Sequence, residues 1–364
     1  MTAAVTRQDI EKKLQTFIEP HLQCDLVTAK AVKSVLIDGG RVRLALELGF
    51  PLAGWREQLI AELSGLLGSV PGVTAVDIDL RVNIITHAVQ KGVKAFGTIR
   101  NIIAVASGKG GVGKSTTAVN LALALAAEGA QVGILDADIY GPSQPRMLGA
   151  SEKPESRDGK SMEPVLRHGL QSMSIGYLIE EDAPMIWRGP MVTGALLQLL
   201  NDTRWHDMDY LVIDLPPGTG DIQLTLSQKI PVSGALIVTT PQDIALLDAR
   251  KALKMFERVA VPVLGIIENM STHICSQCGH EEHIFGEGGG RWMAEQYDVP
   301  LLGSLPLDIR IRQDADGGTP SVIADPGGRI ASLYRQIART AAARLSLQGR
   351  DYSSRFPNIV IENS

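Results

Sequence analysis

The segment from Gly108 to Thr116 reads Gly-Lys-Gly-Gly-Val-Gly-Lys-Ser-Thr, and its residue types point directly to phosphate chemistry. Glycines at this spacing allow successive backbone N–H groups to turn around a polyphosphate, and the helix expected from Ser115 directs the positive end of its dipole at the same anion. We predict that Lys114 contacts the terminal phosphates and that Ser115 binds Mg²⁺. The predicted nucleotide-binding residues of this loop are Gly108, Lys109, Gly110, Gly111, Val112, Gly113, Lys114, Ser115 and Thr116.

The same loop also fits the Gly-x-Gly-x-x-Gly pattern of dinucleotide-binding folds. Such folds place an acidic residue about 20 residues later, and Asp136 ends the next apolar strand in that region. A dinucleotide pyrophosphate bound by backbone amides needs neither a buried lysine nor a hydroxyl group for Mg²⁺. The pair Lys114 and Ser115 therefore favours a nucleoside triphosphate over a dinucleotide.

Carboxylates that follow two other predicted strands supply the remaining groups that phosphoryl transfer needs. The apolar run 210–213 ends in Asp214 and leads into a Pro-Pro-Gly turn. We predict that Asp214 organises Mg²⁺ and water, and that Gly218 offers its N–H near the γ-phosphate. Asp136 and Asp138 follow another apolar strand, and their spacing places both carboxylates on the same side of an extended chain. We assign Asp136 to the Mg²⁺ shell.

Cys275 and Cys278 indicate a second kind of chemistry, metal binding. Two thiols separated by two residues can ligate one metal ion from a single turn. One such pair is half of a tetrahedral site. Three completions fit the residues: an intrachain zinc site, no metal at all, or a site on a two-fold axis to which each of two chains gives both thiolates. The shared site suits zinc or a four-iron cluster and requires a dimer. The candidate additional ligands of an intrachain zinc ion are His273, His280 and His283.

Alternating strands and helices are expected to position these residues. We predict a helix over 115–128 and strands over 102–106, 131–136, 210–214, 234–239 and 263–268. Such alternation is typical of an α/β fold with a parallel sheet covered on both faces, whose ligands bind beyond the carboxyl ends of the strands. Asp136, Asp214 and Asn269 all lie at such ends.

The first 90 residues are predicted to form a separate small α/β domain. Its expected elements are helices over 6–18 and 53–67, strands over 31–37, 41–47 and 76–84, and a hairpin turn at 39–40. No catalytic cluster appears in it, and Cys24 is expected to be a buried small apolar residue. We predict a linker over 91–99, the nucleotide-binding domain over 100–349 and a loosely ordered tail over 350–364.

Composition narrows the possible classes of function. The chain has 364 residues, enough for two domains, with 45% hydrophobic and 4% aromatic residues and a formal charge of −5. Few aromatic residues and no basic excess argue against nucleic acid and acidic membrane surfaces as partners. No apolar run approaches the length of about 20 residues that spans a bilayer, no secretory pattern is present, and three cysteines are too few for a disulfide framework. We expect a cytoplasmic protein.

Lys109 places a second lysine inside the phosphate-binding loop. In this respect the sequence resembles the deviant Walker A ATPases, which include cell-division, plasmid-partition and nitrogenase iron-protein ATPases. The resemblance implies that Lys109 reaches the nucleotide of a partner subunit, and thus implies a nucleotide-dependent homodimer. It also implies that Asp138 belongs to switch I and orients the attacking water, and that Asn269 hydrogen-bonds the adenine edge beside the loop 305–308.

Nearly the whole chain resembles the iron-sulfur carrier ATPases of the Mrp/ApbC type. The resembling segments are 138–143, Trp187 to Met191 and 268–290, and residues 7–90 are similar to the small iron-sulfur assembly domain that often precedes these ATPases. The resemblance implies a labile four-iron cluster held between two subunits by Cys275 and Cys278. In many relatives a loop of the small domain carries a cysteine, whereas residues 49–53 contain none.

These features together predict an ATP-hydrolysing carrier that binds ATP, Mg²⁺ and an iron-sulfur cluster, forms a homodimer and transfers the cluster to apo-proteins. Hydrolysis would then couple the nucleotide site to the cluster site. The alternative is a P-loop ATPase with a structural zinc ion at the Cys-x-x-Cys segment, acting as a positioning or partition switch. A membrane-bound switch needs a terminal amphipathic helix, which the tail lacks, and a reductase like the nitrogenase iron protein has ligand cysteines that are far apart in the chain.

Overall fold

The computed structural model describes residues 5–90, 93–179, 189–275 and 277–349. Trp187, Arg188 and the predicted tail 350–364 lie outside the described residues. The helices are α1 Arg7–Leu14, α2 Arg56–Gly68, α3 Lys114–Ala127, α4 Gln144–Leu148, α5 Gly189–Asp202, α6 Asp221–Lys229, α7 Asp243–Arg258, α8 Gly289–Tyr297, α9 Ile309–Asp316, α10 Ser321–Ala324 and α11 Arg329–Ser346, with a 3₁₀ turn at Ile175–Tyr177.

The strands are β1 Ile18–Glu19, β2 Cys24–Asp25, β3 Val32–Asp38, β4 Arg41–Leu48, β5 Ala75–Val82, β6 Ile99–Ala106, β7 Val132–Asp136, β8 Val165–Arg167, β9 Leu170–Ser174, β10 Met208–Asp214, β11 Gly234–Thr239, β12 Val263–Glu268, β13 His273–Ile274, β14 Glu281–Glu282 and β15 Leu301–Ser304. The predicted strands of the nucleotide-binding part are all present, and β11 and β12 have the predicted bounds. Because β6 begins at Ile99, the last residue of the predicted linker belongs to a strand.

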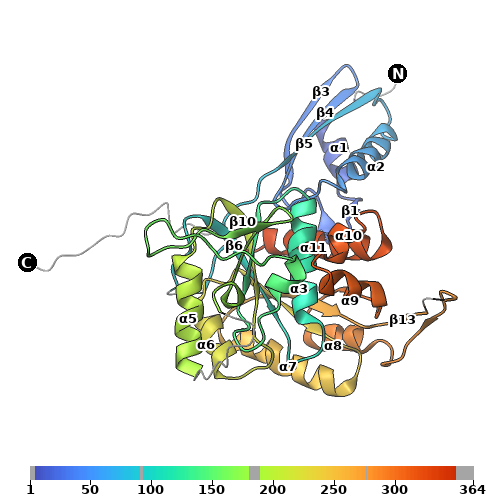
Figure 1. Cartoon of the computed structure of the whole chain (residues 1–364). Coiled ribbons are helices and arrows are strands. Elements are labelled where there is room, and N and C mark those ends of the chain that lie inside the picture. The colour runs from blue at the N-terminus through green and yellow to red at the C-terminus, as the bar shows by residue number, and fades with distance from the viewer. Residues whose placement is uncertain (1–4, 91–92, 180–188, 276, 350–364) are drawn as a thin grey trace, which may run out of the picture.

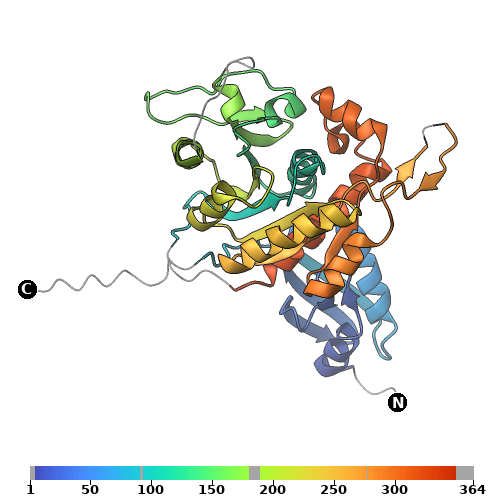
Figure 2. The ribbon, with the colours of Figure 1, turned by 90° about the horizontal axis from the view of Figure 1, so that it is seen from below.

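The large sheet has eight strands in the order β15-β12-β11-β6-β10-β7-β9-β8. Neighbouring strands run parallel except for β8, which is antiparallel to β9 at the edge. Helices α3 and α11 cover one face, and α5 to α8 cover the other (Figures 1 and 2). The predicted α/β class with a parallel sheet covered on both faces is therefore confirmed, while β8, β9 and β15 were not predicted.

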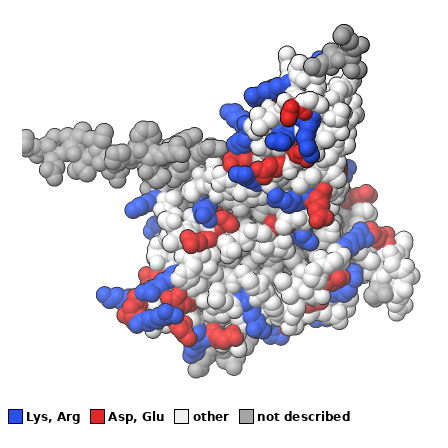
Figure 3. All heavy atoms as spheres, turned by 90° about the horizontal axis from the view of Figure 1, so that it is seen from above, with Lys and Arg blue, Asp and Glu red and all other residues white. Residues whose placement is uncertain are grey.

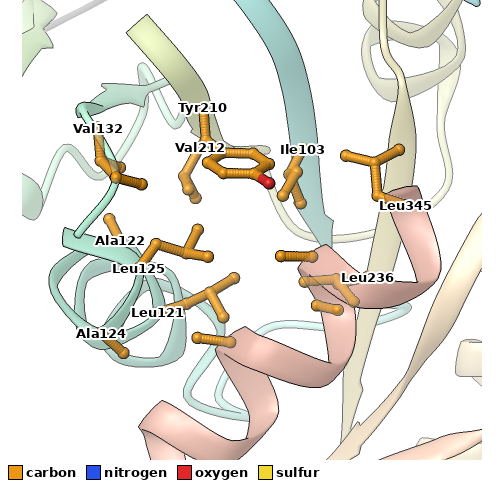
Figure 4. Packing of buried hydrophobic residues seen from close by; sticks show 14 of the residues in the cluster. Ile103, Leu121, Ala122, Ala124, Leu125, Val132, Tyr210, Val212, Leu236 and Leu345 are labelled. Carbon is orange, nitrogen blue, oxygen red and sulfur yellow. The ribbon is translucent and has the colours of Figure 1, made fainter. Parts of the chain in front are cut away.

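The core of this sheet explains why its strands read as continuous apolar runs. On one face, Tyr210 and Val212 of β10 lie against Leu121 and Leu125 of α3 (Figure 4). On the other face, Ile237 of β11 packs with side chains of α7 and α8 in a second buried cluster. Side chains alternate between the faces of a strand, so a strand covered on both faces needs apolar residues at every position.

The small domain is a three-stranded sheet, in which β4 pairs antiparallel with β3 and parallel with β5, packed against α1 and α2 (Figure 1). Thr6 caps α1 and forms a capping box with Asp9. Helix α1 ends at Leu14, earlier than predicted, because Ile18 turns into the short pairing of β1 with β2. Cys24 in β2 was predicted to be buried and is instead partly exposed.

The small domain is fastened to the end of α3 by a buried carboxylate. Glu128 directly follows α3 and accepts hydrogen bonds from Arg335 Nε and Arg339 Nη1 at 2.7 Å each and from the Gly54 N–H at 2.8 Å. Arg339 Nε donates to His21 Nε2 at 3.0 Å. Helix α3 therefore begins in the phosphate-binding loop and ends at the contact with the small domain.

The surface carries both signs of charge. Basic and acidic side chains are interspersed over the face in Figure 3, without a large area of one sign. Among the described residues, no helix is long and apolar enough to cross a membrane.

Candidate functional site

The phosphate-binding loop joins β6 to α3, and two of its glycines are required by close packing. Gly113 precedes α3 in the left-handed conformation, with φ of 79°, and a Cβ atom there would lie 2.2 Å from Asn269 Nδ2. A Cβ atom on Gly108 would lie 2.1 Å from the backbone carbon of Asp248 in α7. Only glycine fits either position, so the loop has a fixed path between α7 and the end of β12.

The structure brings Lys114, Ser115 and Asp214 together from two separate parts of the sequence. Lys114 at the start of α3 forms an ion pair with Asp214 at the end of β10, and these side chains are 6% and 0% exposed. Lys114 Nζ also lies 3.2 Å from Ser115 Oγ. Because both charges are buried, each depends on the other for compensation.

Asp136 lies next to Asp214 in the sheet register and is fully buried. Its carboxylate accepts hydrogen bonds from the N–H groups of Ser143 at 2.9 Å and Asp138 at 3.1 Å and from Ser174 Oγ at 3.1 Å. Burial raises the pKa of Asp136, and the charge of Asp214 raises it further. The two carboxylates therefore form a site that favours a cation.

Asp138 lies just beyond Asp136 and is half-buried. Burial raises its pKa, and the charge of Lys114 opposes that shift. Lys109 is also half-buried, and its carbonyl oxygen accepts a hydrogen bond from Ser107 Oγ at 2.9 Å. Both side chains thus remain partly accessible, in contrast to the deeply buried pair Lys114 and Asp214.

Gly218 and Asn269, both predicted to contact the nucleotide, each make a hydrogen bond within the chain. The Gly218 N–H, predicted to lie near the γ-phosphate, donates to the carbonyl of Ser107 at 3.0 Å, so a phosphate contact requires this bond to open. Asn269, predicted at the adenine edge, is 8% exposed and donates from Nδ2 to the Val112 carbonyl at 2.9 Å. Its amide therefore supports the phosphate-binding loop directly. The loop 305–308 lies beside residues 271–273 and ends in Asp308, which caps α9.

Gln144 contacts the two buried carboxylates and was not predicted from the sequence. Its backbone N–H donates to Asp136 Oδ2 at 3.0 Å, and its Nε2 donates to Asp214 Oδ2 at 2.9 Å and to the Ser115 carbonyl at 3.1 Å. A single glutamine before a proline carries no periodic signal. Only its position a few residues after Asp138, in the same connection, could have singled it out.

Cys275 and Cys278 lie in the turn of a small β-hairpin, formed by β13 and β14, that projects from the body of the molecule (Figures 1 and 2). The Cys275 N–H donates to the His280 carbonyl, and the Gly279 N–H donates to the Cys275 carbonyl, at 2.9 Å each. Arg329 of α11 forms an ion pair with Glu281 of β14. Cys275 is half-buried and Cys278 is exposed, so the turn is ordered by its backbone while its thiols remain accessible.

The turn also favours the thiolate that metal ligation requires. Hydrogen bonds from the backbone N–H groups of Cys278 and then Gln277 lower the pKa of Cys275. Within residues 5–90, 93–179, 189–275 and 277–349, no three His, Cys, Asp or Glu side chains are close enough to hold one metal ion. His273 is instead paired with Glu282, and His283 Nδ1 lies 3.0 Å from the Ser271 carbonyl. The ligand set of the alternative intrachain zinc site is thus not assembled in this part of the chain.

The base of the hairpin is continuous with the nucleotide site. Asn269 contacts the phosphate-binding loop, and two residues later the Ser271 N–H and Oγ both bond to the Leu305 carbonyl, at 2.9 and 3.0 Å. Met270 between them adopts a left-handed conformation with φ of 56°. The loop and the hairpin are therefore linked by a short, well-bonded segment.

Comparison with known families agrees with this geometry. Residues 98–342 match the family model described as the NUBPL iron-transfer P-loop NTPase, and residues 7–78 match a model described as an iron-sulfur cluster assembly protein. The chain belongs to the NUBPL-type iron-transfer P-loop NTPases. The predicted resemblance is confirmed, and the second match falls within the small domain.

Individual relatives have names that also refer to iron-sulfur clusters. An iron-sulfur cluster carrier protein of Escherichia coli K12 is 55% identical over 337 residues, covering 92% of this chain and 91% of the relative. Mouse iron-sulfur cluster transfer protein NUBPL is 51% identical over 267 residues, covering 73% of this chain and 83% of the relative.

Two solved structures are similar to the nucleotide-binding part. A nucleotide-binding protein from Archaeoglobus fulgidus, solved in complex with ADP, has a TM-score of 0.54 at 41% identity and covers 61% of this chain and 87% of that protein. The cell-division ATPase MinD of Pyrococcus furiosus has a TM-score of 0.51 at 21% identity, covering 66% and 97%, and supports the fold alone.

Proposed function

We propose that this protein is an ATP-dependent carrier that holds an iron-sulfur cluster between two copies of the chain and transfers it to apo-proteins. The observation that carries the proposal is the hairpin turn, in which two accessible thiols, one with a lowered pKa, lack further ligands among the described residues. Two such turns supply the four thiolates of a [4Fe–4S] cluster. The names of the relatives support a cluster as the cargo.

The nucleotide site supports hydrolysis of ATP as the driving reaction. Carboxylates, a hydroxyl group and an amide oxygen form the all-oxygen donor set that Mg²⁺ prefers, and the buried Ser143 Oγ and Gln144 Oε1 have no hydrogen-bond partner among the described residues. We assign Ser115, Asp136 and Asp214 to hold Mg²⁺, which when bound neutralises phosphate charge. Lys114 exchanges its ion pair with Asp214 for the terminal phosphates, and Asp138 orients the attacking water.

Lys109 and Asn269 connect this site to assembly and to the hairpin. Lys109 lies at the accessible edge of the loop, where we propose that it contacts the nucleotide of the partner copy. Because Asn269 donates a hydrogen bond to the Val112 carbonyl, it moves with the phosphate-binding loop. The segment that follows Asn269 leads through Ser271 to the hairpin. Nucleotide turnover thereby changes how tightly the two turns hold the cluster. We further propose the predicted linker 91–99, apart from Ile99 of β6, as the division between the two domains.

The test is reconstitution with iron and sulfide under anaerobic conditions, followed by measurement of iron, sulfide and zinc in the wild type, Cys275→Ala and Cys24→Ala. The Cys24→Ala variant is the matched control, because Cys24 lies in the small domain. We expect iron and sulfide in the wild type and the control, their loss in Cys275→Ala, and ATP-stimulated delivery to an apo-ferredoxin. Stoichiometric zinc in place of iron in the wild type would refute the carrier function.

A further inference from the structure

Gln144 occupies a position in the nucleotide site that no sequence motif assigns. Gln144 is 1% exposed. It donates hydrogen bonds of 2.9 to 3.1 Å to Asp136, Asp214 and Ser115. Its backbone belongs to the connection that follows Asp138, whereas Asp214 belongs to β10. Gln144 thus joins the two sides of the proposed Mg²⁺ site.

The partners of Gln144 fix the orientation of its amide. The Asp214 carboxylate and the Ser115 carbonyl can only accept hydrogen bonds, so the NH₂ group must face both of them. The carbonyl oxygen Oε1 therefore faces away from these acceptors. Oε1 is buried and has no hydrogen-bond partner among the described residues. Buried oxygen atoms in native proteins are almost always paired, so a donor is expected at this position.

We propose that Gln144 is a positioning residue for Mg²⁺, whose Oε1 accepts a hydrogen bond from a water molecule of the cation while Nε2 holds the Asp214 carboxylate in place. Mg²⁺ retains several of its water molecules in protein sites, and these molecules are hydrogen-bond donors. The inference rests on the proposed function and deepens it by assigning a determinant of metal dependence. The neighbouring Ser143 Oγ, also buried and unpaired among the described residues, provides a second acceptor beside it.

The test separates metal positioning from simple support of the loop. The affinity for a fluorescent ADP analogue is measured in excess EDTA and in Mg²⁺ for the wild type and Gln144→Leu. Gln171→Leu is the matched control, because Gln171 lies in strand β9, away from the site, and makes two side-chain hydrogen bonds with the backbone of His206. If Gln144→Leu does not fold, Gln144→Met, which preserves the length of the side chain, replaces it.

We expect Gln144→Leu to reduce the enhancement of affinity by Mg²⁺ about fivefold, the effect of one hydrogen bond, and to leave the affinity in EDTA within about twofold of the wild type. Gln171→Leu retains the enhancement. An unchanged enhancement in Gln144→Leu, or an equal loss of affinity with and without Mg²⁺, would overturn the inference. Absence of nucleotide binding by the wild type would instead refute the proposed function.

Discussion

The nucleotide site and the cysteine hairpin differ in how much of each site a single chain supplies. Asp136 and Asp214 are buried at adjacent strand ends, Lys114 is buried at the start of α3, and these residues already contact one another or share partners. Cys275 and Cys278 lie on a projecting turn between strands of two residues each. A buried site held by several hydrogen bonds resists rearrangement, whereas an exposed turn with two thiols is suited to a second copy and to release of its cargo. The nucleotide site is thus suited to a reaction within one chain, and the cysteine hairpin is suited to binding and releasing a cluster.

The largest expected effect is that of Cys278→Ala, which should remove the function of the hairpin and leave that of the nucleotide site. Cys278→Ala removes one thiolate from each copy and should abolish cluster binding, while ATP turnover without the cluster stays within about twofold of the wild type, because the hairpin contributes no group to the nucleotide site. Gln277→Ala, at an exposed neighbouring position of the same turn, is the control and should retain the cluster. Iron content and phosphate release are the measurements. A variant that keeps its full iron content would contradict the ligand assignment.

Lys114→Ala should have the converse effect. Loss of the cation that meets the phosphates is expected to lower ATP turnover by about 100-fold or more. Because Asp214 then keeps a buried charge without its partner, the free energy of unfolding should also fall by about 3–5 kcal/mol. Cluster reconstitution at low temperature should remain, and Lys160→Ala in an exposed loop serves as the control. Turnover equal to that of the wild type would refute the catalytic assignment.

Glu128→Ala tests whether the small domain depends on the end of α3. The variant leaves Arg335 and Arg339 without their buried carboxylate and is expected to lower the free energy of unfolding by about 3–5 kcal/mol. Chemical denaturation provides the measurement. Asp79→Ala removes an exposed ion pair with Arg81, for which a change below about 1 kcal/mol is expected. Equal effects of the two variants would show that the buried contact does not fasten the domain.

The smallest expected effect is the pH dependence of stability that arises from His21, which bonds to Arg339 where the small domain meets α3. Burial, and then the charge of Arg339, lower the pKa of His21 to about 4, from 6.5 in the unfolded chain. Since the unfolded state binds the proton more tightly, stability contributed by neutral His21 is full above about pH 6.5 and is lost as the pH falls toward 4. His21→Gln keeps an acceptor for Arg339 but does not titrate, so its melting temperature should fall less steeply over this range. Identical pH profiles would contradict the assignment.

The extent to which the sequence predicts the molecule also differs between these regions. Strands covered on both faces leave long apolar runs, and β10 and β12 end at a recognisable carboxylate or amide, so the central strands and their site edge were predicted, whereas β8, β9 and β15 were not. The pairing of β13 with β14 involves only two residues on each side and leaves no periodic pattern. Gln144 was missed because its role depends on the neighbours that folding gives it, which local sequence does not encode.

The most direct test of the central claim is the mass of the cluster-loaded protein, measured by native mass spectrometry without oxygen. Two chains with one four-iron cluster are expected, and Cys275→Ala should give metal-free protein. A single chain that retains its full content of iron and sulfide would contradict the account.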